Sequence, residues 1–237
     1  DSTMAEAERL RRENCPGGTL VIADKQLKGR GRYTRSWISD DGGLYLTLVL
    51  RVSVPLHMSF VFNFAASLSL AECINEMYGI TTSVKWPNDV LTDGGRKLCG
   101  ILSDISARGD MVDSVCLGTG INLNNNPSEN LDTAVSVSEI LGKSISRRAF
   151  LKFFLERWET NFSLLGLDKI PPGTGVASLI GKWKAMWFHR DKPVRIVLPD
   201  REVHGIARDI GPNGAIILET EEDPETVIMY GDCENEH

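Results

Sequence analysis

The first half of the chain alternates between short apolar runs and turn-forming residues. Residues 19–23 (TLVIA) form an apolar run suited to a buried strand, and residues 43–51 (GLYLTLVLR) alternate before becoming uniformly apolar, as central strands do. Residues 59–77 carry apolar side chains at helical spacing, and Gly79 is the expected end of that helix. Three further strands are predicted at residues 81–86, 97–105 and 113–123. The pattern predicts a sheet with a long helix packed against it.

The second half begins with helices and ends in short strands. Residues 146–165 predict an amphipathic helix with Ser146 as its N-cap, and we interpret its aromatic stripe as core. A second helix is predicted at residues 176–188. Strands at residues 193–198, 203–210, 215–219 and 226–230 predict a small all-β unit. We expect two domains, residues 1–189 and 190–237, and the smaller one to lean on the larger, because it is near the lower size limit for independent folding.

Composition bounds the class of protein. The 237 residues are 42% hydrophobic, which is enough for a large core, and the formal net charge of −6 argues against nucleic acid or an anionic membrane as a general partner. The five cysteines form no CxxC pair, so we expect reduced thiols and neither zinc nor disulfides. No charged and apolar leader opens the sequence, and no apolar stretch approaches the ~18 residues of a membrane span. We therefore expect a cytoplasmic protein.

One segment is strongly positive although the net charge of the chain is negative. Residues 25–35 (KQLKGRGRYTR) contain five cations and no acidic residue. A solvated connecting loop usually carries mixed signs, and a nucleic-acid patch generally needs a wider basic face than this chain offers. A loop that closes over a small phosphorylated ligand fits better, since glycines permit close approach and arginines provide forked donors for phosphate or carboxylate oxygens. Neither the GxGxxG fingerprint nor a P-loop is present.

Companion motifs follow this loop in a specific order. ADKQLKGRGRYTRSW (23–37) is followed by KWPND (85–89), KLCGIL (97–102) and GTGINLN (118–124), and the chain opens with DST (1–3). Together these segments strongly resemble the biotin–protein ligase family, over nearly the whole chain, in a form without the N-terminal helix-turn-helix domain that some relatives carry. The resemblance implies an α+β fold, with a mixed central sheet flanked by helices as in class II aminoacyl-tRNA synthetases and a small C-terminal SH3-like barrel.

The resemblance also implies a reaction. Such enzymes join biotin to ATP, forming biotinyl-5′-AMP and pyrophosphate with Mg²⁺, and then pass biotin to one lysine of a biotin carboxyl carrier protein domain. The expected partner is therefore a carrier domain of a biotin-dependent carboxylase, with no nucleic acid and no membrane. A monomer and a homodimer both remain open. Related lipoate ligases and a regulator that binds the adenylate without turnover are the alternative functions.

Residue roles carry over onto matching positions. Biotin is expected to contact Ser2, Thr3, Gln26, Gly29, Arg30, Trp37, Lys97, Gly100 and Leu102. ATP is expected to contact Arg32, Arg35, Trp37, Lys85 and Asn122. The expected catalytic groups are Arg30, Arg32, Lys85, Asp89 and Lys97, with Asp89 also a candidate Mg²⁺ ligand. The opening motif departs from the family's usual Asp-Ser-Thr-Asn, because Met4 stands where asparagine is common.

Several of these residues have simpler interpretations. Lys85 and Asp89 would form an ordinary ion pair across the Pro87-Asn88 turn, and Ser2 and Thr3 would cap a helix near residues 5–13. Gly100 would mark a bulge, Asn122 would be a turn residue at a strand end, and Trp37 would belong to the core. Trp86 is assigned to the core, since its neighbour Lys85 points to the other face of the strand.

Overall fold

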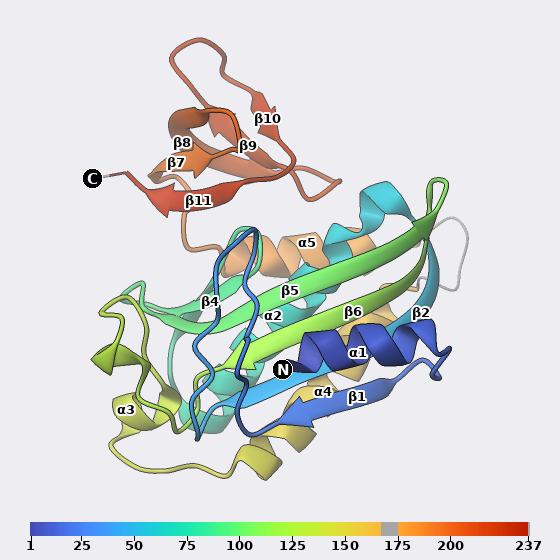
Figure 1. Ribbon diagram of the computed structural model, residues 1–237. Coiled ribbons are helices and arrows are strands. Elements are labelled where there is room, and N and C mark those ends of the chain that lie inside the picture. Colours follow the sequence, from blue (N-terminus) through green and yellow to red (C-terminus); the bar gives the residue numbers. More distant parts are fainter. Residues whose placement is uncertain (167–174, 237) are drawn as a thin grey trace.

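The computed structural model describes residues 1–166 and 175–236. Its larger sheet has the strand order β1-β2-β6-β5-β4-β3 (Figure 1). The strands are β1 (Thr19–Ala23), β2 (Leu44–Pro55), β3 (Thr82–Lys85), β4 (Asp89–Thr92), β5 (Lys97–Arg108) and β6 (Met111–Ile121). All five neighbouring pairs are antiparallel, and the parallel bridges outside these strand pairs are isolated ones, Val84 with Trp187 and Lys97 with Ala134. The α+β class is confirmed. The sheet was expected to mix parallel and antiparallel strands, but among the described residues parallel pairing occurs only in those bridges.

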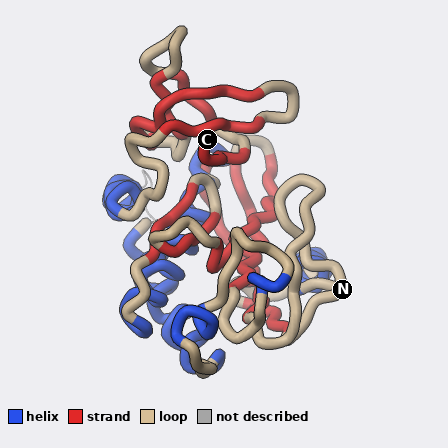
Figure 2. The backbone as a smooth tube through the Cα atoms, turned by 90° about the vertical axis from the view of Figure 1, so that its left-hand side faces the viewer, coloured by secondary structure: helices blue, strands red, loops and turns tan. Residues whose placement is uncertain are grey.

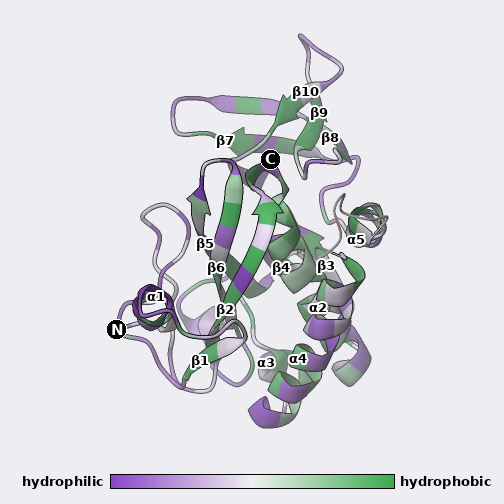
Figure 3. Ribbon diagram, turned by 90° about the vertical axis from the view of Figure 1, so that its right-hand side faces the viewer, coloured by the Kyte–Doolittle hydropathy of each residue, from purple (hydrophilic) through white to green (hydrophobic). Residues whose placement is uncertain are grey.

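Helices cover both faces of this sheet unequally (Figure 3). Helix α1 (Thr3–Arg12) lies on one face, while α2 (Phe60–Tyr78), α4 (Arg147–Leu164) and α5 (Gly175–Ala185) lie on the other. The main core forms on the side of α2, and a small cluster of Met4, Ala7, Val49 and Cys116 forms under α1. The face under α1 is therefore thinly covered, and this leaves room beside the helix for a cavity.

Local sequence explains where the helices begin and end. Gly79 ends α2 with a φ of +67°, and the Ser146 hydroxyl accepts a hydrogen bond from the Ala149 amide at 3.2 Å to begin α4. Phe150, Phe154 and Trp158 are buried, which confirms that the stripe of α4 is core.

One expectation about membrane spans needs correction. The 23-residue segment Leu56–Tyr78, which joins the short helix η1 (Leu56–Met58) to α2, is long and apolar enough to cross a bilayer by length and composition alone. Its apolar window is 72% buried within the protein, as expected for a core helix. The sequence estimate missed it because Asn63 and several serines interrupt the apolar run.

The C-terminal strands form a second sheet at one end of the molecule (Figure 2). In the order β10-β9-β8-β7-β11, it comprises β7 (Pro193–Val197), β8 (Glu202–Ile210), β9 (Ile216–Glu219), β10 (Thr226–Ile228) and β11 (Asp232–Asn235), consistent with a small SH3-like barrel. Trp86 Nε1 donates to the Gly214 carbonyl at 3.0 Å and joins this unit to the larger sheet. The core assignment of Trp86, which is 2% exposed, is confirmed.

Several short elements were not predicted from sequence. Strands β4 and β11 have four residues each, and helix α3 (Val137–Leu141) has five; the single turn η2 (Pro127–Glu129) precedes it. Helix α3 has a capping box in which Ser136 and Glu139 satisfy each other's backbone amides. Two of these elements matter for function, since β4 and β11 each carry an aspartate into the cavity described below.

Candidate functional site

A cavity of about 140 Å³ opens between the start of α1, the basic segment and strands β5 and β6. Most of the residues expected to bind ligands line it: Thr3, Gln26, Arg30, Arg32, Arg35, Trp37, Asp89, Lys97, Gly100 and Leu102. Ser2, Gly29, Lys85 and Asn122 do not. The lining also includes Met4, Thr47, Thr119, Gly120 and Asp232, which were not assigned a role from sequence.

The floor of the cavity is bare backbone. Gly100 on β5 lies opposite Gly120 on β6, and the indole of Trp37 rests on both. A Cβ atom would stand 2.7 Å from Trp37 Cζ3 at Gly100 and 2.5 Å from Trp37 Cε2 at Gly120. Any side chain there would clash with the ring. Trp37 is thus a wall of the cavity rather than part of the main core.

A chain of hydrogen bonds closes one end of the cavity. The Thr3 amide donates to Gln26 Oε1 at 2.8 Å, and Gln26 Nε2 donates to Ser39 Oγ at 2.9 Å. The Thr47 hydroxyl donates to Thr3 Oγ1 at 2.9 Å, so β2 is joined to the start of α1. The chain fixes the polar groups of Thr3 and Gln26 at the cavity wall. Ser39 and Thr47 carried no signal in the sequence, because their role arises only from this long-range contact.

The opening motif divides between two roles. Ser2 is the N-cap of α1, its hydroxyl accepting from the Ala5 amide at 3.2 Å, and the capping interpretation is confirmed. Met4 is 4% exposed and packs its methyl group against Gly118, where an added Cβ would approach within 2.8 Å. Met4 therefore gives the cavity an apolar wall where an asparagine would give a polar one.

Residues 29–37, which we call the flap, form a small hairpin. The Gly31 amide donates to the Arg35 carbonyl at 2.8 Å, and the Trp37 amide donates to the Gly29 carbonyl at 3.0 Å. A Cβ at Gly29 would stand 2.2 Å from the Trp37 carbonyl oxygen, so glycine is required for the hairpin to close. Gly29 acts on the site through flap geometry.

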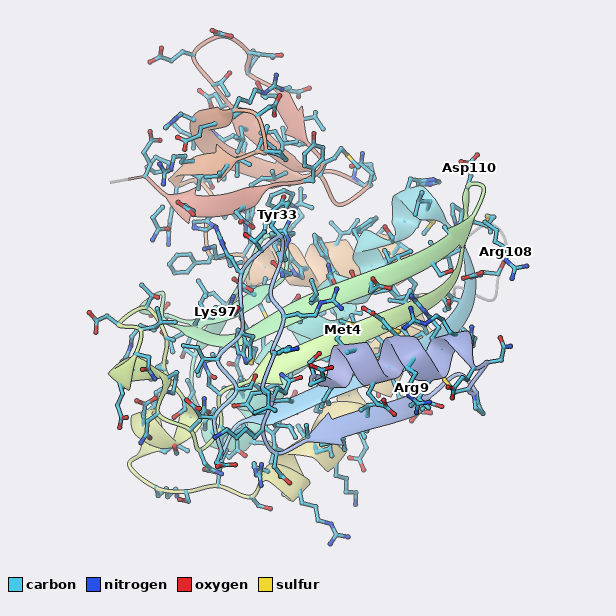
Figure 4. The ribbon with its side chains drawn as sticks, in the orientation of Figure 1. Met4, Arg9, Tyr33, Lys97, Arg108 and Asp110 are labelled. Atoms are coloured by element: carbon cyan, nitrogen blue, oxygen red, sulfur yellow. The ribbon has the colours of Figure 1, made fainter. Side chains whose placement is uncertain are left out.

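Each arginine of the flap is paired with a carboxylate from another element. Arg30 Nη1 lies 2.6 Å from Glu8 of α1. Arg32 Nη1 and Arg35 Nη2 lie 2.8 Å and 2.9 Å from the two carboxylate oxygens of Asp232 on β11. The flap tip, marked by Tyr33 in Figure 4, accordingly lies beside the C-terminal unit. Asp232 was missed because β11 was missed.

Lys97 is the cation of the cavity floor. Its Nζ lies 2.8 Å from Asp89 Oδ1 on β4 and 5.3 Å from the centre of a Trp37 ring. The ion pair is close but poorly aligned for a hydrogen bond. Lys85 on β3 lies opposite Asp89 on β4 in the strand register, but their side chains form no ion pair. The Lys85 ammonium instead lies near His189 and Cys233. The expected Lys85–Asp89 ion pair is therefore replaced by Lys97–Asp89.

Asn122 supports the site from behind. Its Oδ1 accepts from Asn125 Nδ2 at 2.9 Å, and its Nδ2 donates to the Lys97 carbonyl at 3.4 Å. The residue is 3% exposed. Asn122 therefore fixes the backbone of Lys97 and does not itself line the cavity.

Two buried polar atoms around the cavity, Trp37 Nε1 and Thr119 Oγ1, have neither a hydrogen-bond nor an ion-pair partner among the described residues. An unsatisfied buried donor or acceptor costs roughly 1–3 kcal/mol, so both atoms are available to water or to a polar ligand. The cysteines do not offer a nucleophile here. All five are free, and burial raises the pKa of Cys99, the cysteine in the strand that carries Lys97.

No group of three metal-ligating side chains occurs in residues 1–166 and 175–236. Asp89 and Asp232 line the cavity, and both are engaged by cations. Two carboxylates are too few to hold Mg²⁺ on their own. They suit an Mg²⁺ ion that arrives with a nucleotide, where phosphate oxygens and water supply the other ligands.

A sequence model of the biotin/lipoate A/B protein ligase family matches residues 1–122. The chain belongs to this family. The model of the biotin protein ligase C-terminal domain matches residues 189–234 of the ligase. The boundary expected between residues 189 and 190 stays a prediction.

Several relatives and solved structures match most of this member of the ligase family. It is 35% identical over 226 residues to the bifunctional ligase/repressor BirA of Bacillus subtilis, covering 93% of this chain and 67% of that protein. It is 32% identical to the biotin–[acetyl-CoA-carboxylase] ligase of Paracoccus denitrificans, covering 92% and 90%. The biotin protein ligase of Aquifex aeolicus in complex with biotin and ATP matches with a TM-score of 0.79 at 32% identity, covering 99% of this chain and 94% of that one.

Proposed function

We propose that this protein is an ATP-dependent biotin–protein ligase that makes biotinyl-5′-AMP and transfers biotin to one lysine of a carrier domain. The observation that carries the proposal is the convergence of Arg30, Arg32, Arg35 and Lys97 on one small cavity. Family membership supplies the reaction, and this cavity supplies groups of the right chemistry for it.

The first step brings two anions together. An oxygen of the biotin carboxylate attacks the α-phosphorus of ATP, and the bond from that phosphorus to the β-phosphate bridging oxygen breaks, releasing pyrophosphate. Lys97 and the flap arginines stabilise charge on the carboxylate and the α-phosphate as it develops. Mg²⁺, bound mainly by phosphates with Asp89 as a candidate ligand, would neutralise further charge.

The biotin head group is assigned to the end of the cavity with the fixed polar groups. Thr3 and Gln26 supply hydrogen bonds for a ureido group, and the bicyclic ring is assigned to the space beside the Trp37 indole, which itself covers the Gly100–Gly120 floor. Met4 and Leu102 provide apolar contact for the rest of the molecule. In this arrangement Trp37 flanks the ligand and helps to exclude water from the mixed anhydride.

The second step forms an amide. The amine of the carrier lysine attacks the acyl carbon of the adenylate, the bond from that carbon to the phosphate oxygen breaks, and AMP leaves. The attacking amine must lose a proton, and Asp89 is the cavity carboxylate that lies beside Lys97. We assign it that role.

The proposal predicts a labelling result. Incubation with ATP, Mg²⁺, biotin and a biotin carboxyl carrier domain labels one carrier lysine, measured by mass spectrometry. Lys97→Ala and Arg30→Ala greatly reduce labelling, whereas Lys182→Ala, an exposed lysine of α5, does not. An unlabelled carrier alongside a working reference ligase would refute the proposal.

Two alternatives are separated by simpler measurements. A lipoate ligase is stabilised against heat by lipoate more than by biotin, since stabilisation follows ligand concentration relative to Kd. A regulator without turnover binds biotin and ATP but releases no pyrophosphate. We expect a cytoplasmic enzyme, and light scattering distinguishes a monomer from a homodimer.

A further inference from the structure

A single carboxylate of the C-terminal unit holds both outer arginines of the flap. Asp232 Oδ1 lies 2.8 Å from Arg32 Nη1, and Asp232 Oδ2 lies 2.9 Å from Arg35 Nη2. Arg32 Nη1 also donates to the Gly231 carbonyl at 2.9 Å. Arg32 and Asp232 are 200 residues apart in sequence, so the contact depends on how β11 is placed against the flap.

These contacts leave donors free for a ligand. Each guanidinium uses one terminal nitrogen for β11, Nη1 in Arg32 and Nη2 in Arg35, out of five N–H donors on three nitrogens. The Nε of each forms no hydrogen bond or ion pair with a described residue, and Arg32 Nη2 forms only a 3.4 Å hydrogen bond with the Tyr33 hydroxyl. Asp232 therefore holds the arginines in place without using up their capacity to bind phosphate.

Burial indicates which partner fixes the other. The side chain of Asp232 is 12% exposed, whereas that of Arg35 is 61% exposed. An exposed arginine samples many rotamers unless a fixed charge holds it, and holding it in advance removes that entropy cost from ligand binding. Glu234, two residues along the same strand, lies 3.7 Å from Arg35 but pairs chiefly with Arg195 at 2.6 Å.

We propose that Asp232 is a positioning residue that sets Arg32 and Arg35 over the cavity to receive the phosphates of ATP. The proposal rests on the proposed ligase function. It makes the C-terminal unit part of the nucleotide site, acting through the flap. The polar groups that the proposed function assigns to biotin, Thr3 and Gln26, form hydrogen bonds with each other and with Ser39 and Thr47, and none with Asp232.

The test compares Asp232→Asn with Glu234→Gln, which removes the same charge from the same strand. Pyrophosphate release gives the KM for ATP, and calorimetry gives the Kd for biotin without ATP. For Asp232→Asn we expect the KM for ATP to rise about tenfold or more with little change in biotin affinity, and for Glu234→Gln we expect little change in either. Equal KM values for wild type and Asp232→Asn would overturn the inference while leaving the ligase function intact.

A second measurement does not require turnover. Trypsin cleaves after the arginines of the flap, and its rate reports how well they are held. Asp232→Asn should be cleaved in the flap about fivefold faster than wild type or Glu234→Gln, at equal melting temperature. In a double-mutant cycle for ATP affinity, Asp232→Asn should add little to Arg32→Gln/Arg35→Gln, because it acts through those arginines. Unchanged flap cleavage would refute the positioning role even if the protein proved to be inactive.

Discussion

Gly100 on β5 and Gly120 on β6 lie opposite each other, and together they form a side-chain-free strip on which the Trp37 indole rests. This relationship makes three distant segments interdependent. The flap can seat its tryptophan only while both strands remain bare, and the ring then lies within cation–π distance of Lys97 at 5.3 Å. A change at either glycine therefore acts on the flap and on the catalytic lysine together.

The first prediction concerns this floor. In Gly120→Ala the new methyl group would stand 2.5 Å from Trp37 Cε2, so the ring must leave its seat and the flap cannot close as observed. We expect adenylate formation, measured by pyrophosphate release, to fall about a hundredfold. The tryptophan fluorescence of the ligand-free protein should change as well.

Gly181→Ala is the matched control for that change. Gly181 lies within α5 with open space around its Cα, so alanine should stabilise the protein by about 0.5–1 kcal/mol without affecting activity. Full adenylation activity in Gly120→Ala would show that the seat of Trp37 is not needed for catalysis.

The second prediction separates the two chemical steps at Asp89. Asp89→Asn keeps the size of the side chain beside Lys97 but cannot accept a proton from the carrier amine. Transfer from isolated biotinyl-5′-AMP to the carrier should fall about a hundredfold at neutral pH. It should recover partly at higher pH, as the lysine amine loses its proton to solvent.

Adenylate formation should be reduced much less in the same variant, by about tenfold or less. The two steps are measured separately, by pyrophosphate release and by transfer of added adenylate. An equal loss in both steps would indicate instead that Asp89 serves mainly to hold Lys97 or Mg²⁺.

Sequence patterns predicted the regular elements better than the contacts between them. Strand β1 was predicted with its observed bounds and α4 nearly so, because an apolar run and a serine cap are local signals. Strand β4 was missed because it follows the Pro87-Asn88 turn directly, and β11 was missed because its sequence, DCEN, is largely polar.

The site was predicted where motifs carried it and missed where partners come from afar. Lys97, Trp37 and the flap arginines lie together as the family resemblance implied. The pairing of Asp89 with Lys97 rather than Lys85 depends on the β4–β5 register, and the role of Asp232 depends on packing between two units. Neither relationship can be predicted from the spacing of residues along the sequence.

The third prediction distinguishes the cap from the ligand contact at Ser2. The Ser2 hydroxyl caps α1 and does not line the cavity, so Ser2→Ala should lower the free energy of unfolding by about 1 kcal/mol. Ser146→Ala removes the same kind of cap from α4, far from the cavity, and should cost a similar amount.

Biotin affinity then decides between the two roles of Ser2. If the hydroxyl only caps the helix, both alanine variants retain the wild-type Kd for biotin when it is measured by calorimetry well below the melting temperature. A loss of affinity specific to Ser2→Ala would mean that the hydroxyl turns from the Ala5 amide to biotin when the ligand arrives.

The last prediction concerns pH and the junction between the two sheets. His189 is 1% exposed; its Nε2 lies 2.8 Å from Asn235 Oδ1, and its Nδ1 lies 3.2 Å from Cys233 Sγ. Burial is the main cause that lowers the pKa of His189 from 6.5 to about 4, and the nearby cations Lys85 and Lys192 lower it further. Burial raises the pKa of Cys233 to about 12, so the thiol keeps its proton to donate to the neutral imidazole.

The sign of the pH effect follows from where the proton binds. Between pH 6.5 and about 4 the unfolded chain protonates this histidine while the folded protein keeps it neutral, so acid favours the unfolded state. The contribution of His189 is complete above pH 6.5 and is lost as the pH falls towards 4, by up to about 3 kcal/mol. Urea unfolding from pH 7.5 to 4 should show this slope in wild type and in His57→Gln, an exposed-histidine control, and a shallower slope in His189→Gln. Identical slopes in all three proteins would mean that the junction opens in acid before His189 is protonated, or that other groups govern acid sensitivity, and either result contradicts the prediction.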